Sequence, residues 1–176
     1  DEASFDQWLD WLEVDEIIIK PTVSATAEHT YRLREYKREL RNEFADRPFM
    51  VQPFMPSIVS EGEYSLFYFN GEFSHAILKK PKSQDFRVQE EHGGLISAVR
   101  PDSGLLAAGR KAAGHILPVP LYARVDLVRD KFDQFLVMEL ELIEPALYFR
   151  MDTGSAERFA RAITERMDAI DLNEKI

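Results

Sequence analysis

Residues 63–80 read EYSLFYFNGEFSHAILKK, and this stretch decides the fold class. Two aromatic-rich, alternating runs flank Asn70-Gly71, and Asn-Gly between such runs is the strongest short-range signal of a β-hairpin. A second hairpin is predicted further along, where LYARVDLV (121–128) and QFLVMELELIEP (134–145) flank the turn RDKFD (129–133). Antiparallel sheets are therefore expected.

Further elements surround these hairpins. Short strands are predicted for IIIKP (17–21) and PFMVQPF (48–54), each rich in branched or aromatic residues. Helices are predicted where apolar residues recur at helical spacing or alanine is abundant, in residues 4–13, 28–45, 101–115 and 155–171. Hairpins mixed with helices, without regular βαβ alternation, predict an α+β fold.

Composition excludes several classes of protein. The 176 residues include 22 Lys+Arg against 31 Asp+Glu, a formal net charge of −9, and 45% of the residues are apolar. Such a chain can bury a core, and its acidity argues against nucleic-acid and membrane partners. The absence of cysteine excludes disulfides, thiolate metal sites and a cysteine nucleophile. No apolar run approaches the ~18 residues of a membrane span and no signal sequence is evident, so we expect a cytoplasmic protein.

The second hairpin carries the sharpest chemical signal. Side chains alternate along a strand, so Arg124 and Asp126 share one face, as do Glu139 and Glu141 on the partner strand. If the turn lies near 129–133, Asp126 comes close to Glu139, and such a like-charge pair costs up to about 1 kcal/mol. A divalent cation such as Mg²⁺ or Mn²⁺ would reverse that sign. An ordinary solvated acidic face is the alternative, and these residues taken alone favour it.

Two basic features point to an anion. Lys20 ends an isoleucine-rich strand directly before Pro21, where it could reach a phosphate or simply be a surface lysine. A basic cluster next to Gly93-Gly94 could hold a phosphate or a carboxylate, or be an ordinary mobile loop. Its members are Lys79, Lys80, Lys82 and Arg87. The four histidines lack the spacing of a zinc site.

Taken in order, these segments resemble an ATP-grasp ligase of the branch that holds bacterial glutathione synthetases and cycloserine-forming cyclo-ligases. The series runs through IIIKP, VQPF, EGEYSLFYFNGEFSHAILKKP, DFR, GG, ARVDLV and MELELIEP, and covers most of residues 15–149. Each motif is weak alone, whereas the ordered series is specific. The resemblance implies an ATP-grasp fold, with antiparallel sheets, packed helices and a nucleotide between two lobes.

The resemblance also assigns roles to individual residues. Those implied to bind the nucleotide are Lys20, Gln52, Pro53, Phe54, Met55 and Glu63. Among them, Lys20 would contact phosphate and adenine, residues 52–55 would form the hinge strand that reads the adenine edge, and Glu63 would hold the ribose hydroxyls. Lys79 and Arg87 match the catalytic basic residues that face the phosphates and the reacting carboxylate.

Asp126, Glu139 and Glu141 match the Mg²⁺-binding carboxylates of the same family, which favours the metal over the solvated acidic face. Three departures stand out. The loop VSATAEH (23–29) lacks the glycines that many relatives place after Lys-Pro, and Glu141 stands where the third metal ligand is often Asn. The family's N-terminal substrate domain has no counterpart before IIIKP, so residues 1–176 match the C-terminal portion of an ATP-grasp enzyme.

The implied activity is that of an ATP-dependent carboxylate–amine ligase, working through an acyl phosphate with small-molecule carboxylate and amine substrates. ATP and Mg²⁺ or Mn²⁺ are the implied cofactors. A catalytically inactive nucleotide-binding scaffold or sensor module is the alternative, and a plain α+β interaction domain is a third. The oligomeric state stays open, with a homo-oligomer among the options.

Overall fold

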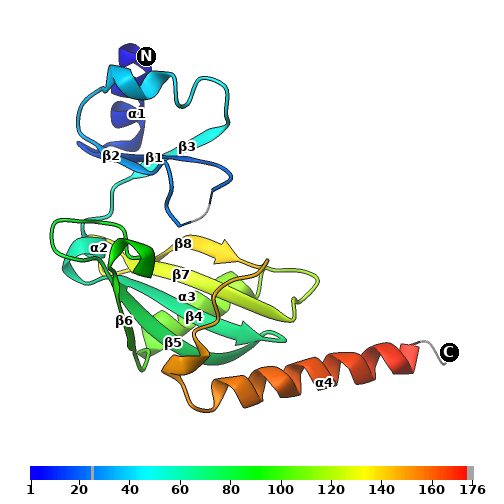
Figure 1. Cartoon of the computed structure of the whole chain (residues 1–176). Coiled ribbons are helices and arrows are strands. Elements are labelled where there is room, and N and C mark those ends of the chain that lie inside the picture. Colours follow the sequence, from blue (N-terminus) through cyan, green and yellow to red (C-terminus); the bar gives the residue numbers. More distant parts are fainter. Residues whose placement is uncertain (25, 174–176) are drawn as a thin grey trace. The chain divides into compact units, whose positions relative to one another are not determined.

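The structure, a computed structural model, describes residues 1–24 and 26–173 (Figure 1). Ala25, in the loop without glycine, lies outside the described residues. The chain forms two compact units, one from Asp1 to Pro56 and one from Ser57 onward, and each is described by itself.

The first unit is a three-stranded antiparallel sheet with one α-helix. The sheet has the order β2-β1-β3, and its strands are β1 (Ile17–Pro21), β2 (Tyr31–Leu33) and β3 (Phe49–Pro53). Helix α1 (Glu2–Leu12) packs on this sheet, with the Trp8 ring 5.7 Å from the Phe49 ring, and a short 3-10 helix, η1, spans Arg38–Arg41. The predicted strands and the first predicted helix are confirmed.

The helix predicted over residues 28–45 is wrong. Strand β2 and η1 occupy this stretch instead. In β2 the residues Tyr31 and Leu33 lie opposite Ile19 and Ile17 of β1, and Leu33 and Ile17 are both buried. Pairing with β1 therefore satisfies the backbone and buries these side chains together, which a separate charged helix would not achieve.

The second unit contains a five-stranded antiparallel sheet of order β6-β5-β4-β7-β8. Its strands are β4 (Glu63–Phe69), β5 (Glu72–Lys80), β6 (Leu95–Ala98), β7 (Tyr122–Arg129) and β8 (Phe135–Glu141). Both predicted hairpins are confirmed as β4–β5 and β7–β8. Asn70 and Gly71 have φ of 48° and 82°, the left-handed pair that a type I′ turn requires.

The second unit also contains helices, before, between and after its strands. They are α2 (Ser57–Ser60), η2 (Glu90–His92), α3 (Ser103–Ala113), η3 (Phe149–Met151) and α4 (Ser155–Asn173). Helix α3 covers one sheet face, while α4 begins with Phe159 packed on Phe69 and then extends away from the sheet (Figure 1). Among the described residues, no helix has both the length and the apolarity needed to cross a membrane.

Alternation along the strands divides the five-stranded sheet into two unlike faces. Leu66, Tyr68 and Val125 face α3 and form an apolar core with Leu105 of that helix. Successive side chains of a strand point to opposite faces, so Asp126, the residue after Val125, lies on the other face of the sheet. That second face carries the charged residues of the candidate site.

Candidate active site

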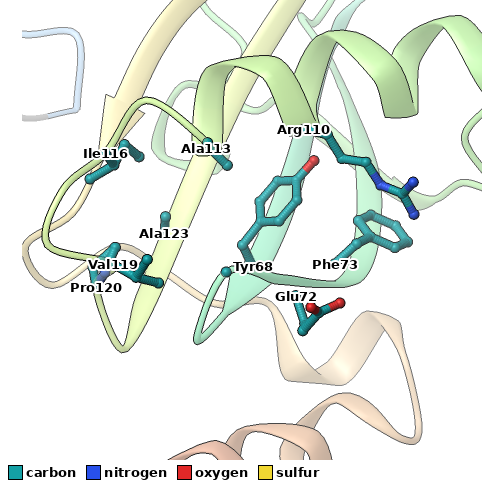
Figure 2. A pocket seen from close by; sticks show the side chains of 11 residues that line it. Tyr68, Glu72, Phe73, Arg110, Ala113, Ile116, Val119, Pro120 and Ala123 are labelled. Atoms are coloured by element: carbon teal, nitrogen blue, oxygen red, sulfur yellow. The ribbon is translucent and has the colours of Figure 1, made fainter.

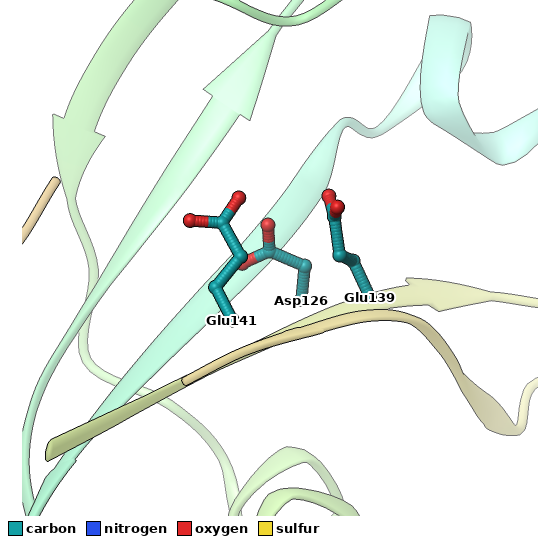
Figure 3. A group of neighbouring side chains, drawn as sticks. All are labelled: Asp126, Glu139 and Glu141. Atoms are coloured by element: carbon teal, nitrogen blue, oxygen red, sulfur yellow. The ribbon is translucent and has the colours of Figure 1, made fainter. Parts of the chain in front are cut away.

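Three carboxylates converge where β7 and β8 pair. Asp126 lies directly opposite Glu139, and Arg124 lies opposite Glu141. One carboxylate oxygen from each of Asp126, Glu139 and Glu141 lies within 4.8 Å of the others (Figure 3). The predicted pairing of Asp126 with Glu139 is confirmed. The register shifts between Asp126 and Leu127, so the sheet is irregular at the cluster, as is common beside functional sites.

Two buried cations hold this cluster in place. The Nζ of Lys79 on β5 lies 2.5 Å from a carboxylate oxygen of Glu63 and 2.9 Å from one of Asp126. Arg124 lies 2.8 Å from Asp126 and also forms an ion pair with Glu141. Lys79 is 4% exposed, so its charge is tolerable only because both carboxylates compensate it.

Electrostatics distinguish Asp126 from its neighbours. Burial alone would raise the pKa of Asp126, but Lys79 and Arg124 outweigh burial and lower it to about 2. Burial dominates at Glu63 and at Glu141, and it raises the pKa of each. The pKa of Lys79 is raised by Asp126 and Glu63, although burial opposes the change. Asp126 and both cations are therefore ionised at neutral pH.

The cluster has the chemistry of a divalent-cation site. Four carboxylates face two cations, so acidic groups exceed basic ones by two. Oxygen-only ligands of this kind suit Mg²⁺ and Mn²⁺. Glu139 is exposed and has no ion-pair partner within the described part of the chain, so it is open to an entering ion. The donor set thus fits the metal that the resemblance implies.

The structure gives the two predicted catalytic cations different environments. Lys79 is a buried member of the cluster, whereas Arg87 lies 3.0 Å from Asp85 in the loop after β5. The hydrogen bond from Arg87 holds the pKa of Asp85 well below its usual range. No ion pair joins Arg87 to the cluster within residues 1–24 and 26–173.

The other predicted nucleotide residues are divided between the two units. Glu63 belongs to the cluster, while Lys20 and residues 52–55 belong to the first unit. Lys20 lies opposite Met50 and Gln52 lies opposite Ile18, so Lys20 and Gln52 share one face of the three-stranded sheet.

The hinge residues beyond Gln52 differ in their surroundings. Pro53 lies opposite Ile17, on the other face of the three-stranded sheet. Phe54 is buried beneath the guanidinium of Arg32, which lies 3.7 Å from the ring centre, and Met55 is half-buried.

Two residues beside the cluster were missed as site residues by the sequence reasoning. Arg124 was read only as a strand neighbour of Asp126, yet it bridges Asp126 and Glu141. Tyr148 has a left-handed backbone, with φ of 48°, and its ring lies 6.2 Å from that of Phe67. Burial and the nearby charge of Glu90 raise the pKa of Tyr148, while Lys79 and Arg124 act to lower it.

Comparison with known proteins identifies the fold. No protein-family model matches the chain. The chain is 30% identical over 171 residues to the cycloserine biosynthesis protein DcsG of Streptomyces lavendulae, covering 88% of this chain. The crystal structure of D-cycloserine synthetase DcsG superposes with a TM-score of 0.76 at 29% identity, over 93% of this chain. This chain has the ATP-grasp fold.

More distant ATP-grasp structures share the fold. D-alanine–D-alanine ligase from Bacillus anthracis matches with a TM-score of 0.66 at 17% identity, over 97% of this chain and 59% of the ligase. The ATP-grasp ligase PsnB, in complex with a precursor variant, Mg and ADP, matches with a TM-score of 0.63 at 14% identity, over 93% of this chain and 50% of PsnB. The predicted resemblance to ATP-grasp proteins, and to their cycloserine-forming branch, is confirmed.

The matched region is only part of each relative. This chain spans 56% of the DcsG sequence and 60% of the DcsG structure. The match covers most of both units of this chain, because it extends over 93% of its residues.

Proposed function

We propose that this chain forms the nucleotide- and metal-binding part of an ATP-dependent carboxylate–amine ligase. The observation that carries the proposal is the convergence of Asp126, Glu139 and Glu141 on one sheet face, backed by two buried cations. In this reaction a substrate carboxylate attacks the γ-phosphate of ATP, which yields an acyl phosphate and ADP. An amine then displaces inorganic phosphate and forms the amide. No covalent protein nucleophile is needed, which suits a chain without cysteine.

The residues of the cluster would divide the work. Asp126, Glu139 and Glu141 would hold Mg²⁺ or Mn²⁺, and the bound ion would neutralise charge on the phosphate oxygens. Arg124 and Lys79 fix the carboxylates in position, because each of these cations bridges two acids. Arg87, which is partly exposed, would offset charge on the phosphates and on the reacting carboxylate.

Each residue predicted to bind the nucleotide would have its own role. Lys20 would supply a phosphate cation, and residues 52–55 would offer backbone groups to the adenine edge. Glu63 would accept hydrogen bonds from the ribose hydroxyls with the oxygen that Lys79 leaves available. The substrates would be a small carboxylate and an amine, and the names of the relatives support this coarse class.

A catalytically inactive nucleotide-binding module is the second candidate. The loop after β1 favours it, because Thr26, Ala27 and His29 adopt positive φ without the glycine that normally permits this backbone. Such a loop has little freedom to fold over phosphates. The two candidates share nucleotide binding and differ in turnover.

One pair of measurements tests both candidates. Titration of the chain with ATP by calorimetry, with Mg²⁺ or with a chelator, should show binding that depends on the metal. In the full-length protein, release of ADP should then increase when a carboxylate and an amine are supplied together. Binding without any release of ADP by the full-length protein would favour the inactive module, and no binding at millimolar Mg-ATP would contradict both candidates.

A matched pair of variants sharpens this test. Lys20→Ala should weaken ATP binding, and the loss should shrink at high salt because salt screens the phosphate interaction. Lys111→Ala removes a lysine of α3, the helix that covers the sheet face opposite the carboxylate cluster, and should leave ATP binding unchanged. Equal affinities for the two variants would contradict the role of Lys20.

A further inference from the structure

A pocket lies on the sheet face opposite the carboxylate cluster. It has a volume of about 460 Å³ and lies between the β4–β5 hairpin, the end of α3 and the following segment, residues 114–120 (Figure 2). Its walls combine apolar and polar groups, and Phe73, Ile116 and Val119 are among the apolar residues. Small-molecule sites commonly have volumes of about 300–1,000 Å³, with apolar walls and a few polar groups.

The first polar group in this wall is the hydroxyl of Tyr68. The Tyr68 side chain is 1% exposed, and its hydroxyl has no hydrogen-bond partner in the described structure. Helix α3 makes room for it at Gly109, where a Cβ atom would lie 2.5 Å from the hydroxyl oxygen. Burial raises the pKa of Tyr68 to about 12, so the group stays protonated. A hydrogen-bond donor without a partner therefore lies covered behind the pocket wall.

The second polar group is the guanidinium of Arg110. This residue is exposed and forms no ion pair with any other described residue, and Figure 2 shows its guanidinium turned toward Phe73. A cation in the last turn of α3 has an ordinary explanation, because it interacts favourably with the helix dipole. That explanation accounts for the charge alone. It leaves the adjacent pocket and the unpartnered hydroxyl without a reason.

We propose that this pocket binds a small carboxylate with an apolar body. Arg110 forms an ion pair with the carboxylate, and a small shift of this exposed side chain lets the Tyr68 hydroxyl donate to the same group. The apolar body lies against Phe73 and Ile116. Glu72 also lines the pocket and repels a second negative charge, which disfavours nucleotides and dicarboxylates. This site is distinct from the carboxylate cluster and does not depend on it.

Hydrocinnamate, a phenyl ring on a short carboxylate chain, is a suitable probe. In a titration of the isotope-labelled chain followed by NMR, we expect saturable shifts at Arg110, Phe73 and Ile116, without shifts at Glu139 or Glu141. The neutral amide of the same compound should bind at least about tenfold more weakly, because it lacks the charge that pairs with arginine. Equal binding of acid and amide, shifts confined to the other sheet face, or no saturation at all would each overturn the proposal.

Three variants give an independent test. Arg110→Gln should weaken hydrocinnamate binding by about tenfold or more, whereas Lys111→Gln, at the next position of α3, should leave it unchanged. Tyr68→Phe removes only an unpartnered hydroxyl, so the free variant should melt at the same temperature as the wild type or higher, yet bind hydrocinnamate more weakly. If Arg110→Gln and Lys111→Gln bind equally well, or if Tyr68→Phe binds as tightly as the wild type, the assignment is wrong.

Discussion

The two faces of the five-stranded sheet are built from the same strands and are stabilised in opposite ways. Val125 and Asp126 are neighbours on β7, and they are 0% and 1% exposed. Val125 packs in the apolar core under α3, where removal of hydrocarbon from water is favourable. Asp126 lies among Lys79 and Arg124, where loss of water is costly and only mutual pairing compensates it.

This difference indicates how the candidate site is held. The apolar face anchors each strand, and each strand then carries its charged residues at a fixed position on the other face. Side chains on rigid strands with locked neighbours make more accurate sites than side chains on loops. The cost is that a buried charge on the polar face, if it loses its partner, has little water to solvate it.

The largest effect is expected where a cation is removed from the charged face. Lys79→Met keeps most of the side-chain length but leaves Glu63 and Asp126 without their shared partner. Breaking a buried ion pair in this way costs about 3–5 kcal/mol, so the free energy of unfolding in urea should fall by that amount. Lys80→Met, one position further on β5 and exposed, is the control and should cost less than about 0.5 kcal/mol. Similar losses in both variants would mean that the cluster adds no pairing energy.

The apolar face should be sensitive to added volume instead. Gly109→Ala would place a Cβ 2.5 Å from the Tyr68 hydroxyl oxygen and 2.6 Å from a Leu66 methyl group. Overpacking of this kind costs about 1–3 kcal/mol, and the better helix propensity of alanine returns up to about 1 kcal/mol. The melting temperature should therefore fall. In the background of Tyr68→Phe the loss should be smaller, because one of the two clashes is gone, and an unchanged loss would show that Leu66 alone sets the cost.

Much of the structure of these two faces could be predicted from short-range sequence patterns. Asn70-Gly71 predicted one hairpin, and the period-two spacing of Arg124 with Asp126 predicted which residues share a face. The position of Asp126 opposite Glu139 followed from the turn, because a short connection fixes the register.

What could not be predicted depends on strand order. Lys79 meets Asp126 because β5 and β7 flank β4, and nothing local in the sequence states that order. The helix prediction for the charged stretch 28–45 was wrong for a related reason, because strand β2 in this stretch forms only when β1 is available as a partner. The left-handed backbone of Tyr148, whose ring lies 6.2 Å from that of Phe67, likewise has no local sequence signal.

A neutral group on the charged face allows a subtler test by pH. His75 stacks on Phe67 with the ring centres 4.3 Å apart, and its Nε2 lies 3.0 Å from the Leu147 carbonyl oxygen, to which it donates. Burial lowers the pKa of His75 below its ordinary value of 6.5, while Asp152 acts to raise it and Arg158 to lower it. The folded protein then binds fewer protons than the unfolded chain, so stability should fall as the pH drops below about 6.5.

Substitution isolates this contribution. In His75→Gln, the free energy of unfolding should change less steeply between about pH 5 and pH 7 than in the wild type, whatever the absolute loss from the missing ring stack. His115→Gln, at an exposed position, should keep the wild-type slope. If the free energy of unfolding changes equally steeply with pH in His75→Gln and in the wild type, the pKa of His75 is the same in the folded and the unfolded protein.

The smallest effect on the metal-free protein is expected at Glu139, and it tests the proposed metal most directly. Glu139→Gln keeps the size of the side chain and removes one of the three converging charges, so repulsion near Asp126 and Glu141 falls. Because Glu139 is exposed, the free energy of unfolding without metal should stay within about 0.5 kcal/mol of the wild-type value, or rise slightly. With Mg-ATP at 100 times its dissociation constant, the wild type should gain about 2.7 kcal/mol, and the variant should lose most of that gain. Glu157→Gln, on α4, should respond to Mg-ATP as the wild type does. If Mg-ATP stabilises Glu139→Gln and the wild type equally, the metal assignment is wrong, and the contrast between the two faces is one of stability alone.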